Sequence, residues 1–146
     1  KVSSEEPTGP DPRTVEAEKL MDAGKFDDAV AAYDALLASE PNDPVLIAGR
    51  NAAALLGRLD GKDPAALLAA AQQHPDDVDA QLAAADVELM GGRSADAFNR
   101  IIQVVRITHD EEREAARTRL LDLFAMVGQS EPEVAAARRS LAAALF

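Results

Sequence analysis

Cysteine is absent from this 146-residue chain, and histidine occurs only twice, at His74 and His109. Without cysteine the chain can form neither a disulfide bond nor a reactive thiolate. A zinc site needs three or four closely spaced ligands, which two separated histidines do not supply. We therefore expect no metal, no cofactor and no redox chemistry in this sequence.

Aromatic residues are also few, with one tyrosine, four phenylalanines and no tryptophan, although 47% of the chain is apolar. Alanine and leucine supply most of the apolar content, and both have a high helix propensity. Small side chains let helix backbones approach one another closely. This composition predicts an all-α fold.

Basic residues are outnumbered, because 15 lysines and arginines face 26 aspartates and glutamates, for a net charge of −11. Nucleic-acid binding draws on clustered lysine and arginine, so we expect no nucleic acid partner. No charge-free apolar run approaches the roughly 20 residues that a transmembrane helix needs. We expect no membrane partner, and a soluble protein in the cytoplasm.

The first ten residues differ in composition from the rest, because Ser3, Ser4, Pro7, Gly9 and Pro10 lie close together there. Stretches rich in serine, proline and glycine commonly connect domains. We interpret residues 1–10 as an interdomain linker and residues 11–146 as one helical domain.

The stretch from Gly24 to Pro41 carries the clearest pattern. Gly24 suits a tight turn between two helices, Ala29 and Tyr33 suit the face between them, and Pro41 ends the second helix. This order resembles a tetratricopeptide repeat (TPR). We predict a TPR-like right-handed superhelix of about eight helices in antiparallel pairs.

Aspartates and prolines mark where the helices begin and end. Asp11, Asp27 and Asp43 are expected to cap three of them, and the helix from Val45 to about Leu59 is apolar on nearly all sides, which predicts that it is buried. The antiparallel pairs are expected at residues 11–41, 43–75, 77–108 and 110–146.

Pro41 and Pro75 are 34 residues apart, which is the TPR period. Superposing successive periods places Asp63 where Ala29 and Ala97 lie, so the middle repeat lacks a small residue at a position where helices cross. We expect the repeat to be defined by Ala17, Leu20, Gly24, Ala29, Tyr33, Pro41, Pro75, Ala85, Gly92 and Ala97.

Paired carboxylates offer the main candidates for catalysis, but each pair lies at the start of a helix. There a negative charge stabilises the positive end of the helix dipole, and capping explains Asp27-Asp28, Asp76-Asp77 and Glu111-Glu112. His74 and His109 lie at equivalent corners between repeats. No nucleophile elbow, phosphate-binding loop or dinucleotide-binding motif occurs. We predict that the domain is not an enzyme.

Stacked helical hairpins form a concave groove lined by the first helix of each pair. Eukaryotic chaperone-tail adaptors of this fold hold a peptide carboxylate with Lys, Arg and Asn, whereas the first helix here offers Thr14, Glu18 and Asp22. We therefore expect that clamp to be absent. A negative groove favours basic or apolar ligands, or is only a solvated acidic face, and its ligand stays open.

The last helix, residues 132–146, carries two stripes at helical spacing. Val134, Ala137, Leu141 and Leu145 can cap the preceding hairpin. A capping helix needs only one apolar face, so the second stripe is either buried by the preceding helix or left for a partner. That second stripe consists of Ala136, Arg139, Ala143 and Phe146.

The end of the chain resembles the end of the YbbN/CnoX family of bacterial thioredoxin-like co-chaperones. The resemblance rests on Arg117, on Leu120 to Phe124, on Gly128 and Pro132, and on Arg138-Arg139-Ser140-Leu141 with the terminal Leu145-Phe146. His74 to Asp77 and the stretch from Gly92 to Ala97 agree with that family's third repeat. Only the last forty or so residues are distinctive.

The resemblance implies a non-catalytic domain that works with an N-terminal thioredoxin domain of the same chain. Members of that family hold unfolded clients and dock on the GroEL chaperonin through the C-terminal helix. By the same resemblance, the contact residues here would be Arg138, Arg139, Leu141, Leu145 and Phe146. The thioredoxin segment itself is missing from this sequence.

Two functions of different class follow. The first is the chaperone-associated interaction domain that the resemblance implies. The second is a general TPR scaffold that binds another protein or its own missing thioredoxin domain, with the last helix serving only as a cap. The coding sequence upstream of Lys1 would distinguish them.

Overall fold

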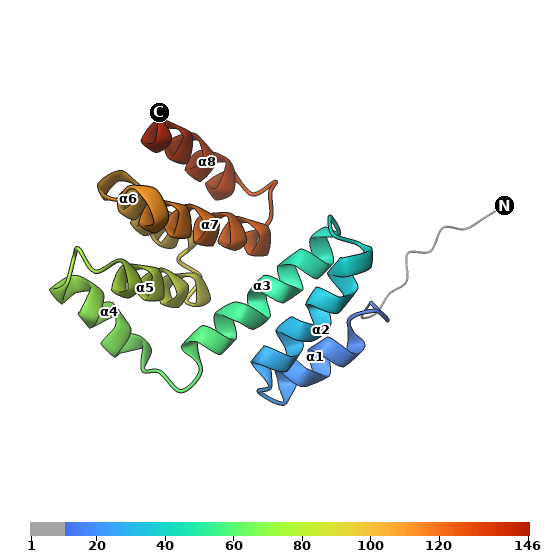
Figure 1. The fold of residues 1–146 in the computed structure, drawn as a ribbon. Coiled ribbons are helices and arrows are strands. Elements are labelled where there is room, and N and C mark those ends of the chain that lie inside the picture. The colour runs from blue at the N-terminus through green and yellow to red at the C-terminus, as the bar shows by residue number, and fades with distance from the viewer. Residues whose placement is uncertain (1–10) are drawn as a thin grey trace.

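The computed structural model describes residues 11–146, and the linker expected at residues 1–10 lies outside the described residues. Every regular element in the described part is a helix (Figure 1), which confirms the all-α prediction. The helices are α1 (Val15–Asp22), α2 (Phe26–Ser39), α3 (Pro44–Leu59), α4 (Pro64–Gln73), α5 (Val78–Met90), α6 (Ser94–Ile107), α7 (Asp110–Val127) and α8 (Pro132–Leu145).

Aspartate caps set the start of three helices. The Asp43 carboxylate accepts hydrogen bonds from the Val45 and Leu46 amides, at 2.9 and 3.3 Å. Asp63 caps α4 and Asp77 caps α5 in the same way. Each side chain satisfies amides that have no partner within the helix. The sequence therefore signals these starts correctly.

Two expected caps were wrong. Asp11 does not cap α1, because a turn at residues 12–14 comes first, and its carboxylate accepts from the Arg13 amide. Asp27 lies in the first turn of α2 and not at its N-cap, which is Lys25. Asp27 still lies near the positive end of the helix dipole.

Gly24 and Gly92 occupy equivalent turns, α1 to α2 and α5 to α6, with φ of +74° and +77°. Glycine adopts this left-handed conformation without the steric cost that a Cβ brings. The turns of the first and third hairpins therefore both depend on a glycine in the left-handed conformation.

Helix packing divides the core into two clusters that α3 connects. The first lies among α1, α2 and α3 and contains Ala17, Ala29, Tyr33, Leu46 and Ala53. The second is larger, lies among α5, α6, α7 and α8, and also includes Leu55 of α3. One helix thus contributes to both cores.

In two of the expected antiparallel pairs, the two helices do not pack closely against each other. Over residues 43–75, α3 packs against α2 and α7, and α4 packs against α5 instead. Figure 1 shows α3 and α4 diverging from the loop that joins them. Over residues 110–146, α8 packs mainly on α6 and touches α7 less extensively.

The physical reason in the middle repeat is Asp63. Ala29 and Ala97 are buried within α2 and α6, where a small side chain lets the paired helix approach. Asp63 is exposed at the N-cap of α4, so α4 begins later in the repeat. The helix is short and offers no small residue at that crossing.

The expectation that α3 is buried on all sides was also wrong. Leu46, Asn51, Ala53 and Leu55 are its buried residues, and Val45 is exposed. Because α4 does not cover α3, part of its apolar surface is only half-buried. In the described residues, no helix has the length and hydropathy to cross a membrane.

Candidate protein interaction surfaces

The inward face of α8 closes the helical stack. Val134, Ala137 and Leu141 are buried, and Leu145 packs partly buried against the same core cluster. The spacing of these residues places them on one side of the helix. α8 therefore caps the larger core cluster of the domain.

The outward face of α8 is left uncovered by the described residues. Ala136, Arg139 and Ala143 are exposed, and the Phe146 side chain has a relative exposure of 104%. An exposed aromatic side chain at a helix end makes a favourable anchor for a partner, because burying it releases a large apolar area. We call Ala136, Arg139, Ala143 and Phe146 together the outward stripe.

Arg138 belongs to the packing of α8. Its guanidinium carbon lies 5.3 Å from the centre of the Phe124 ring, as in a cation–π contact, and the guanidinium also donates to the side chain of Gln129. The Phe124 ring in turn meets Phe98 edge-on, with centroids 5.0 Å apart. Arg138 thus holds α8 to the aromatic core.

The structure separates the five contact residues that the resemblance implies. Leu141 is 8% exposed, so it stabilises the cap and offers no contact surface. Leu145 is half-buried in packing, and Arg138 is exposed but contacts the Phe124 ring. Arg139 and Phe146 are exposed and adjoin the two alanines of the outward stripe.

The repeat-defining positions lie where the helices meet or turn. Ala17, Ala29, Tyr33, Ala85 and Ala97 are buried and Leu20 is half-buried, Gly24 and Gly92 lie in turns, and Pro41 and Pro75 follow the ends of α2 and α4. Asn51, which shares the register of Ala17 and Ala85, is buried and donates to the Asp122 carbonyl oxygen at 3.2 Å. These residues build the scaffold.

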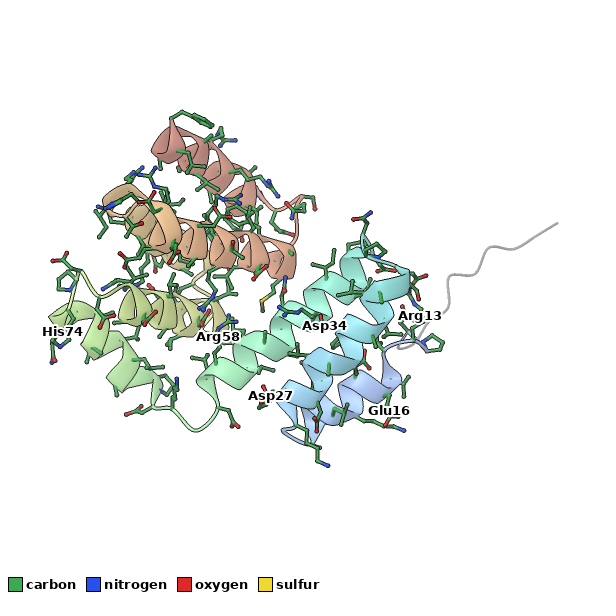
Figure 2. The ribbon with its side chains drawn as sticks, viewed as in Figure 1. Arg13, Glu16, Asp27, Asp34, Arg58 and His74 are labelled. Carbon is green, nitrogen blue, oxygen red and sulfur yellow. The ribbon has the colours of Figure 1, made fainter. Side chains whose placement is uncertain are left out.

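A buried carboxylate joins α3, α5 and α7. Asp86 is 1% exposed and accepts from Arg58 Nε and Nη2 at 2.8 and 3.0 Å. It also accepts from Arg119 Nη1 at 2.8 Å. Figure 2 shows Arg58 between α3 and α5. A carboxylate this deeply buried needs such partners, and the shared pairing fixes α3 against α5 and α7.

Comparison with known proteins identifies the family to which this chain belongs. The family model described as "Tetratricopeptide repeat" matches residues 57–146, which is more than half of the chain. The chain belongs to the tetratricopeptide repeat family. Domains of this family are protein interaction scaffolds and are generally not catalytic.

Curated relatives of this TPR chain come from mycobacteria. An uncharacterized protein of Mycobacterium bovis and uncharacterized proteins from two strains of Mycobacterium tuberculosis are each 39% identical to it over 145 residues. The match covers 99% of this chain and 47% of each relative, so the chain spans about half their length. No solved structure gives a significant match.

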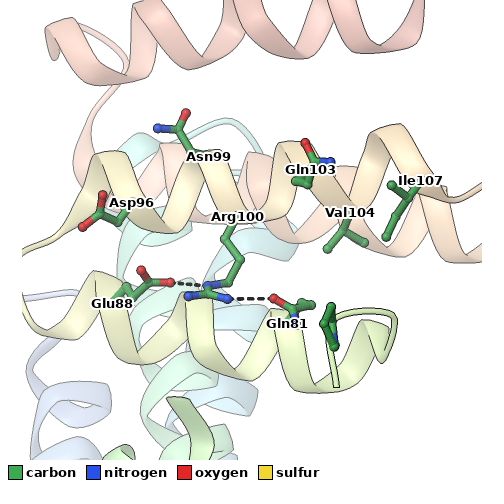
Figure 3. A pocket seen from close by; sticks show the side chains of 9 residues that line it. Gln81, Glu88, Asp96, Asn99, Arg100, Gln103, Val104 and Ile107 are labelled. Carbon is green, nitrogen blue, oxygen red and sulfur yellow. Dashed lines mark hydrogen bonds and ion pairs between the residues drawn. The ribbon is translucent and has the colours of Figure 1, made fainter. Parts of the chain in front are cut away.

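A second polar cluster of the TPR domain lies between α5 and α6 (Figure 3). The Arg100 guanidinium donates to Gln81 Oε1 at 2.7 Å and to the Glu88 carboxylate. Gln81 Nε2 in turn donates to the Ala71 carbonyl oxygen of α4 at 2.8 Å. A cavity of about 370 Å³ lies over this cluster. Because its polar groups are paired with one another, the cluster serves to hold α4, α5 and α6 together.

Sequence reasoning missed Arg58, Asp86, Arg119 and the Gln81–Glu88–Arg100 cluster. A signal was present, because Asp86 and Glu88 interrupt the apolar run of α5 at positions that a buried helix face would occupy. Charged residues in such a run are seldom buried unless they are paired. Their partners come from distant parts of the chain and could not be identified by spacing.

The N-terminus of the described TPR domain is tied to the next helices by Arg13. Its guanidinium donates to Asp11, to Glu40 and, at 2.7 Å, to Asp43. Hydrogen bonds from Arg13 lower the pKa of both Asp11 and Asp43 below the usual value. These pairs are exposed, so they contribute little to stability.

No constellation for catalysis or metal binding is formed by residues 11–146. His74 and His109 are exposed at the end of α4 and the start of α7. Within the described residues, no group of three or more His, Cys, Asp or Glu side chains could hold a metal ion.

Proposed function

We propose that this TPR domain is the non-catalytic interaction domain of a bacterial thioredoxin-like co-chaperone in the cytoplasm. In this proposal, the protein holds unfolded clients and passes them to a GroEL-type chaperonin. α8 docks on the chaperonin, and an N-terminal thioredoxin domain belongs to the same protein.

The observation that carries the proposal is the outward stripe of α8. Its alanines leave room for close approach, and Arg139 and Phe146 stand out from the surface without a described partner. Aromatic and arginine side chains are the usual anchors of protein interfaces. A helix that presents one such face can enter an apolar groove of a partner.

A second candidate function follows from the inward face of α8. Because Arg138, Leu141 and Leu145 are engaged in packing, capping alone accounts for three of the five residues that the family resemblance implies. In that case the domain is a general TPR scaffold that binds another protein, or its own thioredoxin domain, through other surfaces.

The distinguishing experiment is a pull-down from a bacterial lysate. Deleting α8 would remove the buried Val134, Ala137 and Leu141 and expose the core that they cover, so the outward stripe must be tested by substitution. The test variant carries Arg139→Glu with Phe146→Ala. The matched control carries Lys19→Glu with Val45→Ala, which reverses one exposed cation and truncates one exposed apolar side chain on α1 and α3.

We expect chaperonin with the wild-type chain and with the control, and none with the test variant. Equal recovery with all three would favour the general scaffold. Circular dichroism establishes that each variant is folded. Independently, a coding sequence upstream of Lys1 without a thioredoxin domain would contradict the co-chaperone assignment.

A further inference from the structure

A small cavity lies where α3, α5 and α7 meet, on a different surface from the outward stripe of α8. Its volume is about 190 Å³, below the roughly 300 Å³ at which pockets for small molecules and cofactors begin. Arg58, Lys62 and Arg119 line it together with Asp86, and Leu59 and Leu82 add apolar walls. It can hold the end of one side chain.

The charge of this cavity is opposite to that of the chain. Three cations line it, against the two carboxylates of Asp79 and Asp86, whereas the whole chain carries −11. Asp86 is shared between the two arginines. Lys62 is exposed. The lining side chains therefore carry one positive charge in excess, and the carboxylate of Asp122, outside the lining, also interacts with Arg58 and Arg119.

Hydrogen-bond donors in the cavity remain available to a ligand. Arg58 uses Nε and Nη2 for Asp86, and Arg119 uses only Nη1. Among the described residues, no fully buried side-chain nitrogen or oxygen lacks a partner, so the other donors of these guanidiniums reach accessible space. Their side chains are 31% and 21% exposed.

The pKa of Arg119 is lowered chiefly by its burial. The nearby Arg58 lowers this pKa further, whereas the Asp86 and Asp122 carboxylates oppose the shift. An additional anion beside Arg119 would therefore be stabilised by both guanidiniums.

We propose that this cavity binds the side-chain carboxylate of a glutamate in an extended segment of a partner protein. A carboxylate matches the planar donor fork of arginine, and the methylene groups of glutamate can pack on Leu59 and Leu82. Asp79, Asp86 and the acidic surface of the chain repel a polyanion, which argues against nucleic acid. The inference does not depend on the proposed chaperonin docking.

The test is a titration monitored by the side-chain Nε–Hε NMR signals of Arg58 and Arg119 in the 146-residue chain. The probe is a blocked pentapeptide with one glutamate between two leucines, flanked by glycines. The matched probe has glutamine in place of glutamate. The test variant is Lys62→Gln, because Lys62 is exposed and its loss leaves the Asp86 pairing intact, and the control is Lys25→Gln in the turn between α1 and α2.

We expect the glutamate peptide alone to shift both arginine signals in a saturable way. Lys62→Gln should weaken its binding about fivefold, since an exposed charge contact contributes up to about that factor, and Lys25→Gln should leave it unchanged. Equal shifts with the glutamine peptide, tighter binding of inorganic phosphate, or binding that requires a free terminal carboxylate would each overturn the proposal. So would the absence of any shift.

Discussion

Phe146 and Leu141 lie one and a half turns apart near the end of α8 and occupy opposite environments. Phe146 is fully exposed, whereas Leu141 is 8% exposed in the core. Truncating a buried leucine to alanine typically costs about 2–5 kcal/mol, because it leaves a cavity. Truncating an exposed side chain usually changes stability by less than about 0.5 kcal/mol.

We therefore expect Leu141→Ala to lower the unfolding free energy by about 2–5 kcal/mol and Phe146→Ala to leave it nearly unchanged. Urea denaturation followed by circular dichroism measures both. A loss of several kcal/mol in Phe146→Ala would show that this ring packs against the domain in solution.

Asp122 makes the stability of the domain depend on pH. Burial raises its pKa above 3.8, although Arg50, Arg58 and Arg119 lower it. The folded state then binds the proton more tightly than the unfolded state, so ionisation of Asp122 destabilises the fold as the pH rises from about 3.8 through the higher folded value.

Asp122→Asn removes this ionisation. We expect the unfolding free energy of the variant, minus that of the wild type, to become more positive between pH 3 and pH 7. Thermal or urea unfolding at the two pH values gives the difference, and the other acidic groups are common to both proteins. A difference that is constant or falls with pH would show that the arginines outweigh burial.

At the scale of the helices, α3 is the element on which the arrangement depends. It packs on α2, with contacts from Gly49 to Gly57, and also on α7. Gly49 makes the first contact possible, because a Cβ added there would lie 2.5 Å from the Tyr33 ring atoms Cε1 and Cζ. Tyr33 is buried and has little room to move.

Gly49→Ala should therefore destabilise the domain by about 1–3 kcal/mol, the usual cost of overpacking, despite alanine's higher helix propensity. Gly91→Ala is the control, since Gly91 has φ of −81° and an added Cβ would make only ordinary contacts. Chemical denaturation compares the two. Equal stabilities would show that α2 and α3 separate slightly at little cost.

The helices themselves were largely predictable from the sequence, whereas some of their partners were not. Asp43, Asp63 and Asp77 signal helix starts through local hydrogen bonds, which sequence spacing records. Apolar periodicity identifies the face of α3 that packs but does not say which helix covers it. The contact of α3 with α7 was therefore missed, although Asp63 already showed that the middle repeat departs from the pattern.

The candidate surfaces were predictable to a similar extent. Helical spacing separated the two stripes of α8 correctly, but it left open which of them would be covered. The cavity lined by Arg58 and Arg119 could not be predicted, because residues far apart in the sequence meet there only after α3 crosses α7. Long-range ion pairs of this kind leave no local pattern.

At the scale of the whole molecule, the family match supports a scaffold whose functions lie on its surfaces. The match covers residues 57–146 and not the Gly24–Pro41 stretch with the clearest repeat pattern. The matched part of the chain ends in α8, which both closes the core and presents the outward stripe. In the function proposed above, this stripe is the docking surface.

The most direct test is the equilibrium affinity of the purified chain for a purified GroEL-type chaperonin, measured for the wild type and for Phe146→Ala. We predict saturable binding by the wild type and at least about tenfold weaker binding by the variant, as expected for an aromatic anchor worth more than about 1.4 kcal/mol. Equal affinities for two equally stable proteins, or no binding by the wild type, would contradict the claim.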